Sequence, residues 1–400
     1  MSSLSTLEDL GLDTLEGVVT LVRVDFNVPL SGGKVLDDTR LRAALPTIRE
    51  LKSAGARLVL MSHLGRPQGQ LKPEHSLRPV AATLAGLLGE PVAFAANCVG
   101  EAARTEIDKL PPDGICLLEN VRFHIGETEN DSSFADGLAT PGQAYVNDAF
   151  GTAHRAHAST VGVAERIERR AAGRLLVKEV DALDRLLDEP ERPFAAIVGG
   201  AKIDTKVGAV HNLLPRLDLL VLGGGMANTF LAAQGRDLAN SLVEKDKIGL
   251  VREILDEATR RFIRVLLPVD LVVTDDLENP TRIETVAADA VPPGTLAVDI
   301  GDASRRAVTE ALSPCRTILW NGPLGVFEKS PFDSGTMAVA AAVGMSDAFT
   351  VIGGGETVAA ARQAGILEDL GHVSTGGGAA LEFLAGKKLP GIAVLERTHD

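Results

Sequence analysis

The sequence predicts an α/β protein of two doubly wound parallel-sheet (Rossmann-like) domains joined by a hinge helix. Short apolar runs rich in β-branched residues alternate with helical stretches along most of the 400 residues. A length of this order suits two domains. One charged helical stretch, near residues 164–188, interrupts the alternation and ends in the turn-prone Asp188-Glu189-Pro190. That interruption marks the expected boundary.

The alternation defines the expected elements in order. In the first half, strands are expected at 18–24, 57–62, 115–120 and 144–148, with helices at 40–53 and 77–89. In the second half, strands are expected at 194–200, 218–224, 264–270, 317–322 and 349–354. Strand–helix–strand units make parallel sheets with helices on both faces. We therefore expect domains at 1–170 and 191–385, connected by an interdomain helix within 171–190.

Composition narrows the class of protein. A net charge of −14 argues against nucleic acid or an anionic membrane as the main partner. Three widely separated cysteines form no C-x-x-C pair, which argues against disulfides and a cysteine metal site. Neither a leader pattern nor an apolar run of membrane-spanning length is present. We expect a cytoplasmic protein.

Polar segments follow the first-half strands. Because the carboxyl ends of parallel strands line the ligand crevice, these segments should meet at one rim. A lone surface Arg is usually solvated, and His154 with His157 could be cap or core histidines, with a metal pair less favoured. Convergence of four segments instead favours a small polyanion site, since guanidinium groups bind phosphate and carboxylate in pairs of hydrogen bonds. The rim residues are Arg40, His63, Arg66, Arg122, His124, His154, Arg155 and His157.

Glycine clusters follow the second-half strands. They lie at 199–200, 223–225, 353–355 and 376–378, and the last two open helical stretches. Glycine permits close approach of backbone to a ligand, and helix N-termini favour phosphate oxygens. After Gly200 a helix is expected to begin at once and to carry Lys202 and Lys206 on one face. Tight turns and a solvated basic face are the plain alternative, but repetition at successive strand ends favours a nucleotide site.

The common nucleotide motifs are absent. The sequence has neither G-x-x-x-x-G-K-[ST] nor G-x-G-x-x-G, which counts against P-loop enzymes, protein kinases and nicotinamide-dependent oxidoreductases. A non-enzymatic two-domain binder of a phosphorylated metabolite would explain the arginine rim. It would leave the glycine turns and the lysine pair without a purpose.

Taken together, these segments closely resemble the phosphoglycerate kinase family over essentially the whole chain. The matching segments, in order, are RVDFNVP (23–29), DDTRLRAALPTI (37–48), SHLGRP (62–67), ENVRFH (119–124), NDAFGTAHRAH (147–157), GGAK (199–202), GGGMANTF (223–230), LPVD (267–270), WNGPLGVFE (320–328) and STGGGA (374–379). The resemblance implies reversible, Mg²⁺-dependent phosphoryl transfer between 1,3-bisphosphoglycerate and ADP, giving 3-phosphoglycerate and ATP. It also implies a monomer, a hinge near 178–188, and a C-terminal tail (386–400) that returns to the first domain.

The resemblance also implies roles for single residues. The implied triose ligands are Asp25, Phe26, Asn27, Arg40, His63, Leu64, Gly65, Arg66, Arg122 and Arg155. The implied nucleotide ligands are Gly199, Lys206, Gly223, Gly224, Asn321, Pro323, Glu328, Gly354, Gly355, Glu356 and Thr357. The groups implied to meet the transferred phosphoryl are Arg40, Lys202, Gly376 and Gly377. Glu356 is the implied protein contact to Mg²⁺, which the nucleotide phosphates would otherwise hold.

Three positions depart from the family pattern. Glu356 stands where Asp is usual, Asp204-Thr205 adds a negative charge between the lysines, and Ala297 replaces a frequent glycine. They leave open a catalytically weakened relative. The chemistry itself needs no general base, because a carboxylate nucleophile is ionised at neutral pH. It needs positioning and stabilisation of charge on the phosphoryl oxygens, so the histidines are interpreted as positioning or structural groups.

Overall fold

The computed structural model describes residues 4–397, which divide into two compact units. Unit 1 contains residues 1–181 together with 388–400, and unit 2 contains residues 182–387. The division falls inside one helix, α7 (Arg174–Leu187). Residues 1–3, and 398–400 of the predicted C-terminal tail, lie outside the described part.

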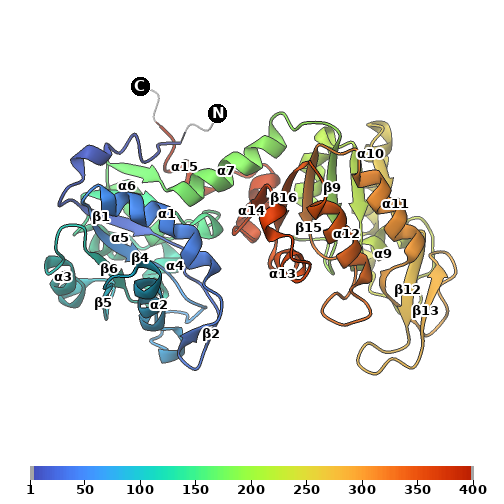
Figure 1. Cartoon of the computed structure of the whole chain (residues 1–400), viewed down its shortest axis with the longest axis horizontal. Helices are drawn as coiled ribbons and strands as arrows, with labels where there is room; N and C mark the ends of the chain where they lie inside the picture. The colour runs from blue at the N-terminus through green and yellow to red at the C-terminus, as the bar shows by residue number, and fades with distance from the viewer. Residues whose placement is uncertain (1–3, 398–400) are drawn as a thin grey trace. The chain divides into compact units, whose positions relative to one another are not determined.

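Unit 1 is built on a six-stranded parallel sheet in the order β5-β6-β4-β1-β7-β8 (Figure 1). Its strands are β1 (Val19–Arg23), β4 (Arg57–Met61), β5 (Ala93–Ala95), β6 (Ile115–Leu118), β7 (Ala144–Asn147) and β8 (Arg170–Ala172). A short hairpin joins β2 (Leu30–Ser31) to β3 (Lys34–Val35). Its helices are α1 (Thr39–Ser53), α2 (Arg78–Leu88), α3 (Gly100–Asp108), α4 (Ile125–Glu129), α5 (Ser132–Ala139), α6 (Val163–Arg166) and α15 (Pro390–Ala393).

Unit 2 repeats the plan with the parallel order β11-β10-β9-β15-β16-β17. The strands are β9 (Phe194–Val198), β10 (Leu219–Leu222), β11 (Arg264–Leu266), β15 (Thr317–Asn321), β16 (Phe349–Gly353) and β17 (His372–Val373). An antiparallel sheet, β13-β12-β14, joins β12 (Asp270–Thr274), β13 (Ile283–Ala287) and β14 (Leu296–Ile300). The helices are α8 (Val207–Leu213), α9 (Gly224–Ala233), α10 (Ile248–Arg260), α11 (Asp302–Leu312), α12 (Ser334–Gly344), α13 (Gly355–Gln363) and α14 (Gly378–Leu384).

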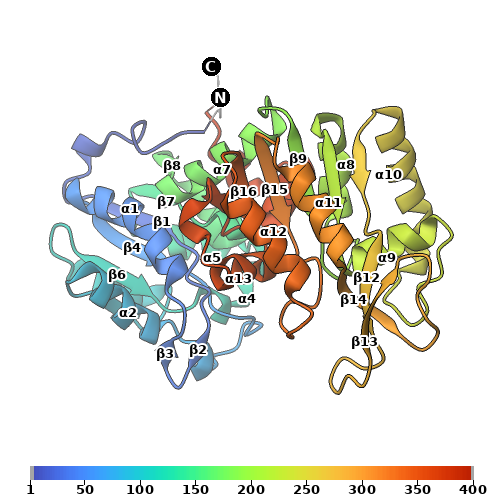
Figure 2. The same cartoon turned by 45° about the vertical axis from the view of Figure 1, so that its right-hand side comes forward.

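The central strands of each six-stranded sheet are buried on both faces, as continuous apolar strands predict. All five residues of β1, β9 and β15 are buried. In unit 1, alternate strand residues such as Val22 and Leu60 pack with Leu41 and Ile48 of α1. In unit 2, Figure 2 shows α11 and α12 lying in front of the strands, where residues such as Val339 join Trp320 in one core. The predicted fold class is therefore confirmed.

The first strand of each unit lies inside its sheet. Strand β1 has β4 on one side and β7 on the other, and β9 likewise lies between β10 and β15. In unit 1 the connections that follow the neighbouring strands β1 and β7 run toward opposite edges of the sheet, and in unit 2 the same holds for β9 and β15. Such a reversal opens a crevice at the carboxyl ends of the two strands. The residues predicted to bind ligands follow these strands.

Three predicted elements need correction. The helical stretch at 164–188 is broken by β8, which pairs with β7, because tertiary pairing outweighs the weak strand propensity of Arg-Ala-Ala. The strand predicted at 264–270 is two strands in different sheets, β11 and β12, with Pro268 in the connection between them. The helix predicted to follow Gly200 begins only at Val207.

Candidate functional site

The rim of unit 1 is a set of paired side chains. Arg40, in the first turn of α1, donates to Asp25 Oδ2 at 2.5 Å. Asn27 Oδ1 accepts a hydrogen bond from the backbone N–H of Gly65 at 2.9 Å, which joins the loops after β1 and β4. Gly65 has φ +62°, so glycine is required at this turn. The structure thus brings the predicted Asp25, Asn27, Arg40 and Gly65 together.

Other predicted rim residues differ in exposure. Arg122 is buried and donates to the carbonyl of Gly65 at 2.8 Å, and its pKa is lowered to about 10 by burial and by Arg23 and Arg155. Arg66 is exposed, with no hydrogen bond or ion pair to the rest of the described chain. Arg155 is half-buried and donates to His154 Nε2 at 3.1 Å. Phe26 and Leu64, in the loops after β1 and β4, are buried, and their packing restrains those loops.

A buried polar network lies behind the rim. Arg23 is completely buried; its Nε donates to Ser159 Oγ at 2.8 Å and its Nη2 lies 3.2 Å from His63 Nδ1. Ser159 donates through its backbone N–H and its Oγ to the two carboxylate oxygens of Glu127, at 2.9 and 2.7 Å. Arg23 always donates, so His63 Nδ1 must accept and His63 carries its proton on Nε2. Burial and the nearby guanidinium groups lower the pKa of His63 well below its usual value, which keeps it neutral.

The remaining predicted rim histidines have structural surroundings. His157 begins a short helical segment and forms a capping box with Thr160. His124 stacks on Phe134, with ring centroids 4.7 Å apart, and its Nε2 lies 2.8 Å from Asn97 Oδ1. Among the described residues, no group of three or more His, Cys, Asp or Glu could hold a metal. His157 thus has the helix-cap position that was one of its alternatives, and His124 packs against the buried Phe134.

In unit 2 the two predicted lysines do not share a helix face. Residues 201–206 form turns, and Lys206 occupies the N-cap position of α8. Lys206 Nζ points back to the carbonyls of Gly199, at 2.5 Å, and Asn321, at 3.4 Å. Burial lowers its pKa to about 8, and the Glu356 carboxylate opposes that shift. Lys202 is exposed on the turn. Gly200, which follows β9, has φ +92°, so the turn favours glycine at this position.

Asp204, the negative charge between the two lysines, has a counter-ion. This carboxylate pairs with Lys247 Nζ at 2.6 Å, and the neighbouring Ile203 N–H donates to Glu244 Oε1 at 2.6 Å. The extra negative charge is therefore compensated by a lysine. These contacts hold the turn that carries Lys202.

The glycine turns of unit 2 are joined through their backbones. Gly199 N–H donates to the carbonyl of Asn321 at 3.0 Å, Gly200 N–H to that of Pro323 at 2.8 Å, and Gly224 N–H to that of Leu324 at 2.9 Å. A Cβ on Gly199 would lie 2.0 Å from the carbonyl oxygen of Pro323, so no other residue fits. Asn321 Nδ2 donates to the carbonyl of Gly353 at 2.9 Å, and Thr357 Oγ1 accepts from Gly322 at 2.7 Å. The predicted residues of this half are thus brought together.

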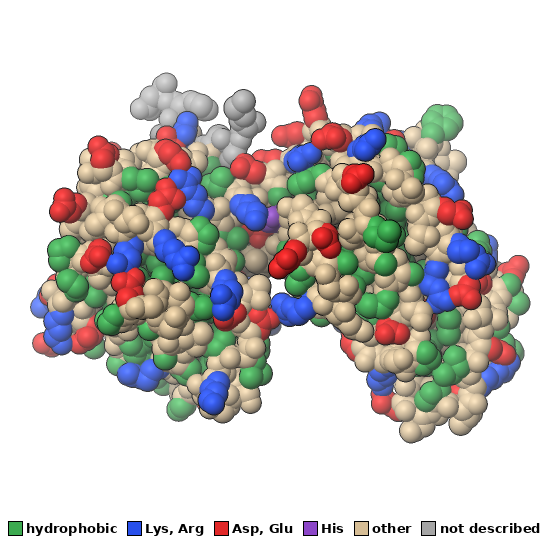
Figure 3. All heavy atoms as spheres, in the orientation of Figure 1, with side chains coloured by type: hydrophobic (Ala, Val, Ile, Leu, Met, Phe, Trp, Pro, Cys, Tyr) green, Lys and Arg blue, Asp and Glu red, His purple; other side chains and the backbone are tan. Residues whose placement is uncertain are grey.

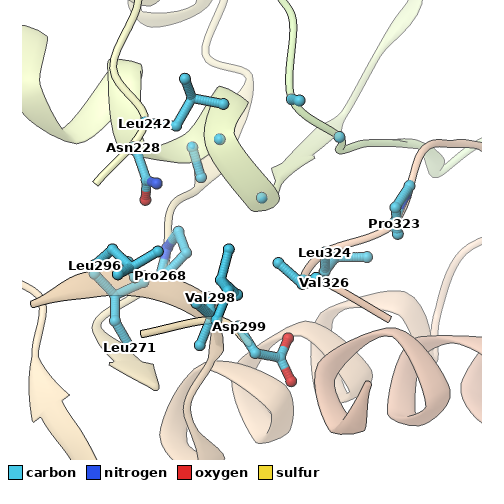
Figure 4. Close-up of a pocket in the computed structure, with 18 of the residues that line it drawn as sticks. Asn228, Leu242, Pro268, Leu271, Leu296, Val298, Asp299, Pro323, Leu324 and Val326 are labelled. Atoms are coloured by element: carbon cyan, nitrogen blue, oxygen red, sulfur yellow. The ribbon is translucent and has the colours of Figure 1, made fainter. Parts of the chain in front are cut away.

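A pocket opens beside these turns (Figure 4). Its lining combines apolar side chains with the glycine turns, Asn228 and three carboxylates, Asp299, Glu328 and Glu356. Ala297 belongs to the wall, and its N–H donates to Ser241 Oγ at 2.8 Å. The larger apolar lining residues are Leu242, Pro268, Leu271, Leu277, Leu296, Val298, Pro323, Leu324 and Val326.

The glycine clusters at 353–355 and 376–378 open helices as predicted. Helix α13 begins at Gly355 and α14 at Gly378. Gly354 has φ +91° and Gly377 φ +51°, so both turns need glycine. Glu356 is exposed in the first turn of α13.

Two residues of the site escaped the sequence analysis. Arg23 and Asp299 are both buried, and both contact backbone or side chains that shape a predicted site. Their signal was a charged residue inside an apolar strand, in VTLVR and LAVDI. The apolar wall of the pocket was missed because its residues come from segments distant in sequence.

The fold and these two sites define a class: two-unit α/β proteins with a cationic rim on one doubly wound sheet and a glycine-lined pocket on the other. Comparison with known proteins names the family. The phosphoglycerate kinase family model matches residues 7–387. The phosphoglycerate kinase of Moorella thermoacetica is 51% identical over 390 residues, covering 98% of each chain, and that of Synechococcus elongatus is 50% identical with the same coverage.

Solved structures agree with the sequence relatives. The structure of phosphoglycerate kinase from Coxiella burnetii matches with a TM-score of 0.86 at 40% identity, covering 95% of this chain and 96% of that one. Phosphoglycerate kinase from Pyrococcus horikoshii OT3 matches with a TM-score of 0.85 at 33% identity, covering 98% of each chain. This chain belongs to the phosphoglycerate kinase family.

Proposed function

We propose that the chain catalyses reversible phosphoryl transfer between 1,3-bisphosphoglycerate and ADP, giving 3-phosphoglycerate and ATP. The observation that carries this is the match to curated phosphoglycerate kinases at about 50% identity over nearly the full length. The absence of P-loop and dinucleotide motifs agrees with it.

The triose would bind on the rim of unit 1. A bisphosphorylated or carboxylate-bearing triose is a small polyanion, and guanidinium groups bind such anions with paired hydrogen bonds. Arg66, free of protein partners in the described chain, and the partly exposed Arg40 are available to it. Neutral His63 would donate one hydrogen bond from Nε2 without adding charge. Asp25 and Asn27 hold Arg40 and Gly65 in place for it.

The nucleotide would bind in the pocket of unit 2. The apolar walls suit a base, and the glycine turns, which carry no side chain, allow phosphates to approach the backbone closely. Lys206 would exchange its backbone carbonyl partners for phosphate oxygens, and Glu328 stands at the pocket edge where a ribose hydroxyl would need an acceptor.

Mg²⁺ fits this site as an ion held mainly by nucleotide phosphates. It commonly uses one or two carboxylates together with phosphates and water. Glu356 offers one carboxylate, and its Oε2 lies 3.9 Å from the position that a Cβ would take on Gly200. Bound there, the ion would neutralise phosphate charge. Glu356 is thus the proposed ligand, in place of a shorter aspartate.

The residues of the chain would act by positioning and charge. The attacking carboxylate is ionised at neutral pH, so no residue has to remove a proton. Lys202, Arg40 and the amides at Gly376 and Gly377 would stabilise charge on the three equatorial oxygens during in-line transfer. Because the proposed ligands bind to different units, transfer requires the two to meet, and the flanks of α7 are the proposed hinge. Scattering profiles identical with and without both ligands would contradict the hinge.

The direct test is turnover of purified protein with MgATP and 3-phosphoglycerate, coupled to a dehydrogenase that consumes the acyl phosphate. Robust activity is expected, with little gain in the Glu356→Asp variant. No activity despite tight binding of both ligands would indicate a weakened relative. No binding of nucleotide would indicate a triose binder.

A cytoplasmic monomer is the proposed state of the enzyme. Three free, buried cysteines suit a reducing compartment. Within residues 4–397, no helix combines the length and the apolar character that a membrane crossing needs. Acidic and basic side chains are interspersed on the face visible in Figure 3, as expected for a surface without a large single-sign field.

A further inference from the structure

Asp299 is a buried carboxylate that the proposed chemistry does not use. It lies on β14, where the strand passes the pocket, and its side chain points to the opposite side of the strand from Val298 (Figure 4). Only 3% of the residue is exposed. A carboxylate is costly to bury unless hydrogen bonds compensate it, so its contacts indicate its role.

The carboxylate ties α12 to β14. Its Oδ2 accepts from the N–H of Gly335 at 2.7 Å and its Oδ1 from the N–H of Ile300 at 2.8 Å. Gly335 lies in the first turn of α12, whose own N-cap residue, Asp333, makes no side-chain cap. An N–H that the helix leaves unpaired is thus satisfied from another element, and a negative charge at the helix N-terminus is favourable.

From α12 the connection continues to the pocket wall. Thr336 Oγ1 accepts from the N–H of Leu324 at 3.1 Å, and Val326 N–H donates to the carbonyl of Val298 at 2.8 Å. Segment 323–326 is thereby fixed at both ends. Its carbonyls in turn hold the glycine turns at Gly200 and Gly224. The series of contacts that fixes both turns therefore begins at Asp299.

The fit around the carboxylate is close. A Cβ on Gly325 or on Gly335 would lie 2.3 Å from Asp299 Oδ1. Such a distance is shorter than any non-bonded contact that packed atoms adopt, so the two glycines leave room only for this side chain. A methyl group at Gly325 would displace the carboxylate while leaving its charge intact.

We propose that Asp299 is a positioning residue for nucleotide binding, which holds segment 323–326 so that the glycine turns at 200 and 224 present their backbones to the phosphates. This inference rests on the proposed function, since it takes the pocket of unit 2 to be the nucleotide site. Asp299 makes no contact with the reacting atoms in this scheme. It acts through Gly335, Thr336 and Leu324.

The ionisation of Asp299 offers a second test, which is the pH dependence of the nucleotide KM. Burial raises its pKa to about 7; the N–H groups of Gly335 and Ile300 and the charge of Arg305 oppose the shift, and Asp333 adds to it. Protonation below pH 7 removes acceptor capacity from one oxygen. The nucleotide KM should therefore rise as the pH falls through 7, and this part of the pH profile should be absent without the carboxylate.

The experiment compares Asp299→Asn with Asp270→Asn in steady-state kinetics. Asp270 is a matched control, because it caps α11 through Ala303 and Ser304 from the same small sheet but does not line the pocket. Burial raises its pKa, yet those hydrogen bonds outweigh burial and leave it lowered, so it stays ionised near pH 7. Asp299→Asn should raise the nucleotide KM about tenfold, equivalent to ~1.4 kcal/mol, with kcat and triose KM unchanged. Asp270→Asn should lose stability without a change in nucleotide KM.

The possible outcomes distinguish a failure of this inference from a failure of the proposed function. Equal loss of stability in both variants, with the nucleotide KM unchanged in both, would reduce Asp299 to a helix cap and overturn the inference. If Asp299→Asn does not fold, Gly325→Ala tests the same contact, and an unchanged nucleotide KM in that variant overturns the inference too. Wild-type protein that neither turns over nor binds ADP would instead overturn the proposed function.

Discussion

The two units build their candidate sites by different means, although each is based on a six-stranded parallel sheet. In unit 1 the candidate ligand groups are side chains, and a buried side-chain network of Arg23, Ser159 and Glu127 supports them. In unit 2 the candidate ligand groups are mostly backbone, and glycines that leave no room for a Cβ support them. Under the proposed function, charge would select a small polyanion in the first case. Shape would admit a larger, partly apolar ligand in the second.

The difference predicts opposite sensitivities. A side-chain site depends on charges that are costly to bury and expensive to leave unpaired. A backbone site depends on close packing, so one added methyl group disturbs it while most side-chain changes do not. Substitutions of each kind in each unit test the comparison.

Breaking the buried network of unit 1 should have the largest effect. Glu127 is completely buried; burial raises its pKa, but the His157 side chain, whose Nδ1 lies 3.7 Å from Oε1, the charge of Arg23 and hydrogen bonds from Ser159 lower it overall. Glu127→Ala removes the buried carboxylate whose charge offsets that of Arg23 and leaves Ser159 without its acceptor, so the free energy of unfolding should fall by about 3–5 kcal/mol. Chemical denaturation measures it. The exposed Glu129→Ala is the control, and equal losses in both would refute the network.

Lys202 is the side-chain exception in the backbone-built site. Lys202→Ala should lower kcat by ~2–4 kcal/mol in activation free energy, the scale of one preorganised charge. Steady-state kinetics with both substrates saturating measures it. Arg260→Ala, which removes an exposed cation from the same unit, should leave kcat unchanged. Near-normal turnover of the Lys202 variant would mean that its assigned role is wrong.

A single methyl group should break the turn of unit 2. In Gly199→Ala the new Cβ meets the carbonyl of Pro323, so the protein should lose about 1–3 kcal/mol of stability and bind nucleotide weakly. Thermal unfolding and ADP titration measure the two effects. Gly249→Ala in α10 meets no atom within 4 Å and should be slightly stabilising. Similar behaviour of both variants would contradict the packing argument.

Loss of one rim arginine should affect one substrate. Arg66→Ala should raise the triose KM about tenfold, or ~1.4 kcal/mol, and leave the nucleotide KM unchanged, because the exposed guanidinium serves no structural pair. Arg42→Ala, which loses a surface pair with Asp38, is the control. A parallel rise in nucleotide KM would show that the two units are not independent in binding.

The smallest expected effect is the uptake of protons by Lys206 when nucleotide binds. Burial lowers the pKa of Lys206 to about 8, so above that pH the free enzyme carries it mostly neutral. Phosphate favours the charged lysine and raises its pKa, so nucleotide binding at pH 8.5 should take up about half a proton or more, falling toward zero at pH 7. Titration calorimetry in two buffers of different ionisation enthalpy measures the uptake. A Lys206→Met variant should show none.

The sequence predicted the sheets and most of the residues that gather at their carboxyl ends, because strand–helix alternation and glycine clusters are local signals. It failed where the determining contact was distant. Strand β8 exists through pairing with β7, and the turn that delays the helix start to Val207 is held by Lys206 turning back to Gly199 and by Ile203 N–H donating to Glu244. Arg23 and Asp299 were missed for the same reason, because the role of a charged residue in a strand depends on partners that are distant in sequence, here Ser159 and Gly335.

The two ends of the described chain meet within unit 1. Leu4 pairs with Glu396 in an antiparallel bridge, Ser5 N–H donates to the carbonyl of Leu395, and Asn147 Nδ2 donates to that of Gly391. The returning segment begins at 388, after all of unit 2. On the ribosome, unit 1 must therefore wait for residues 388–396 before these contacts can form, although its sheet is synthesised first.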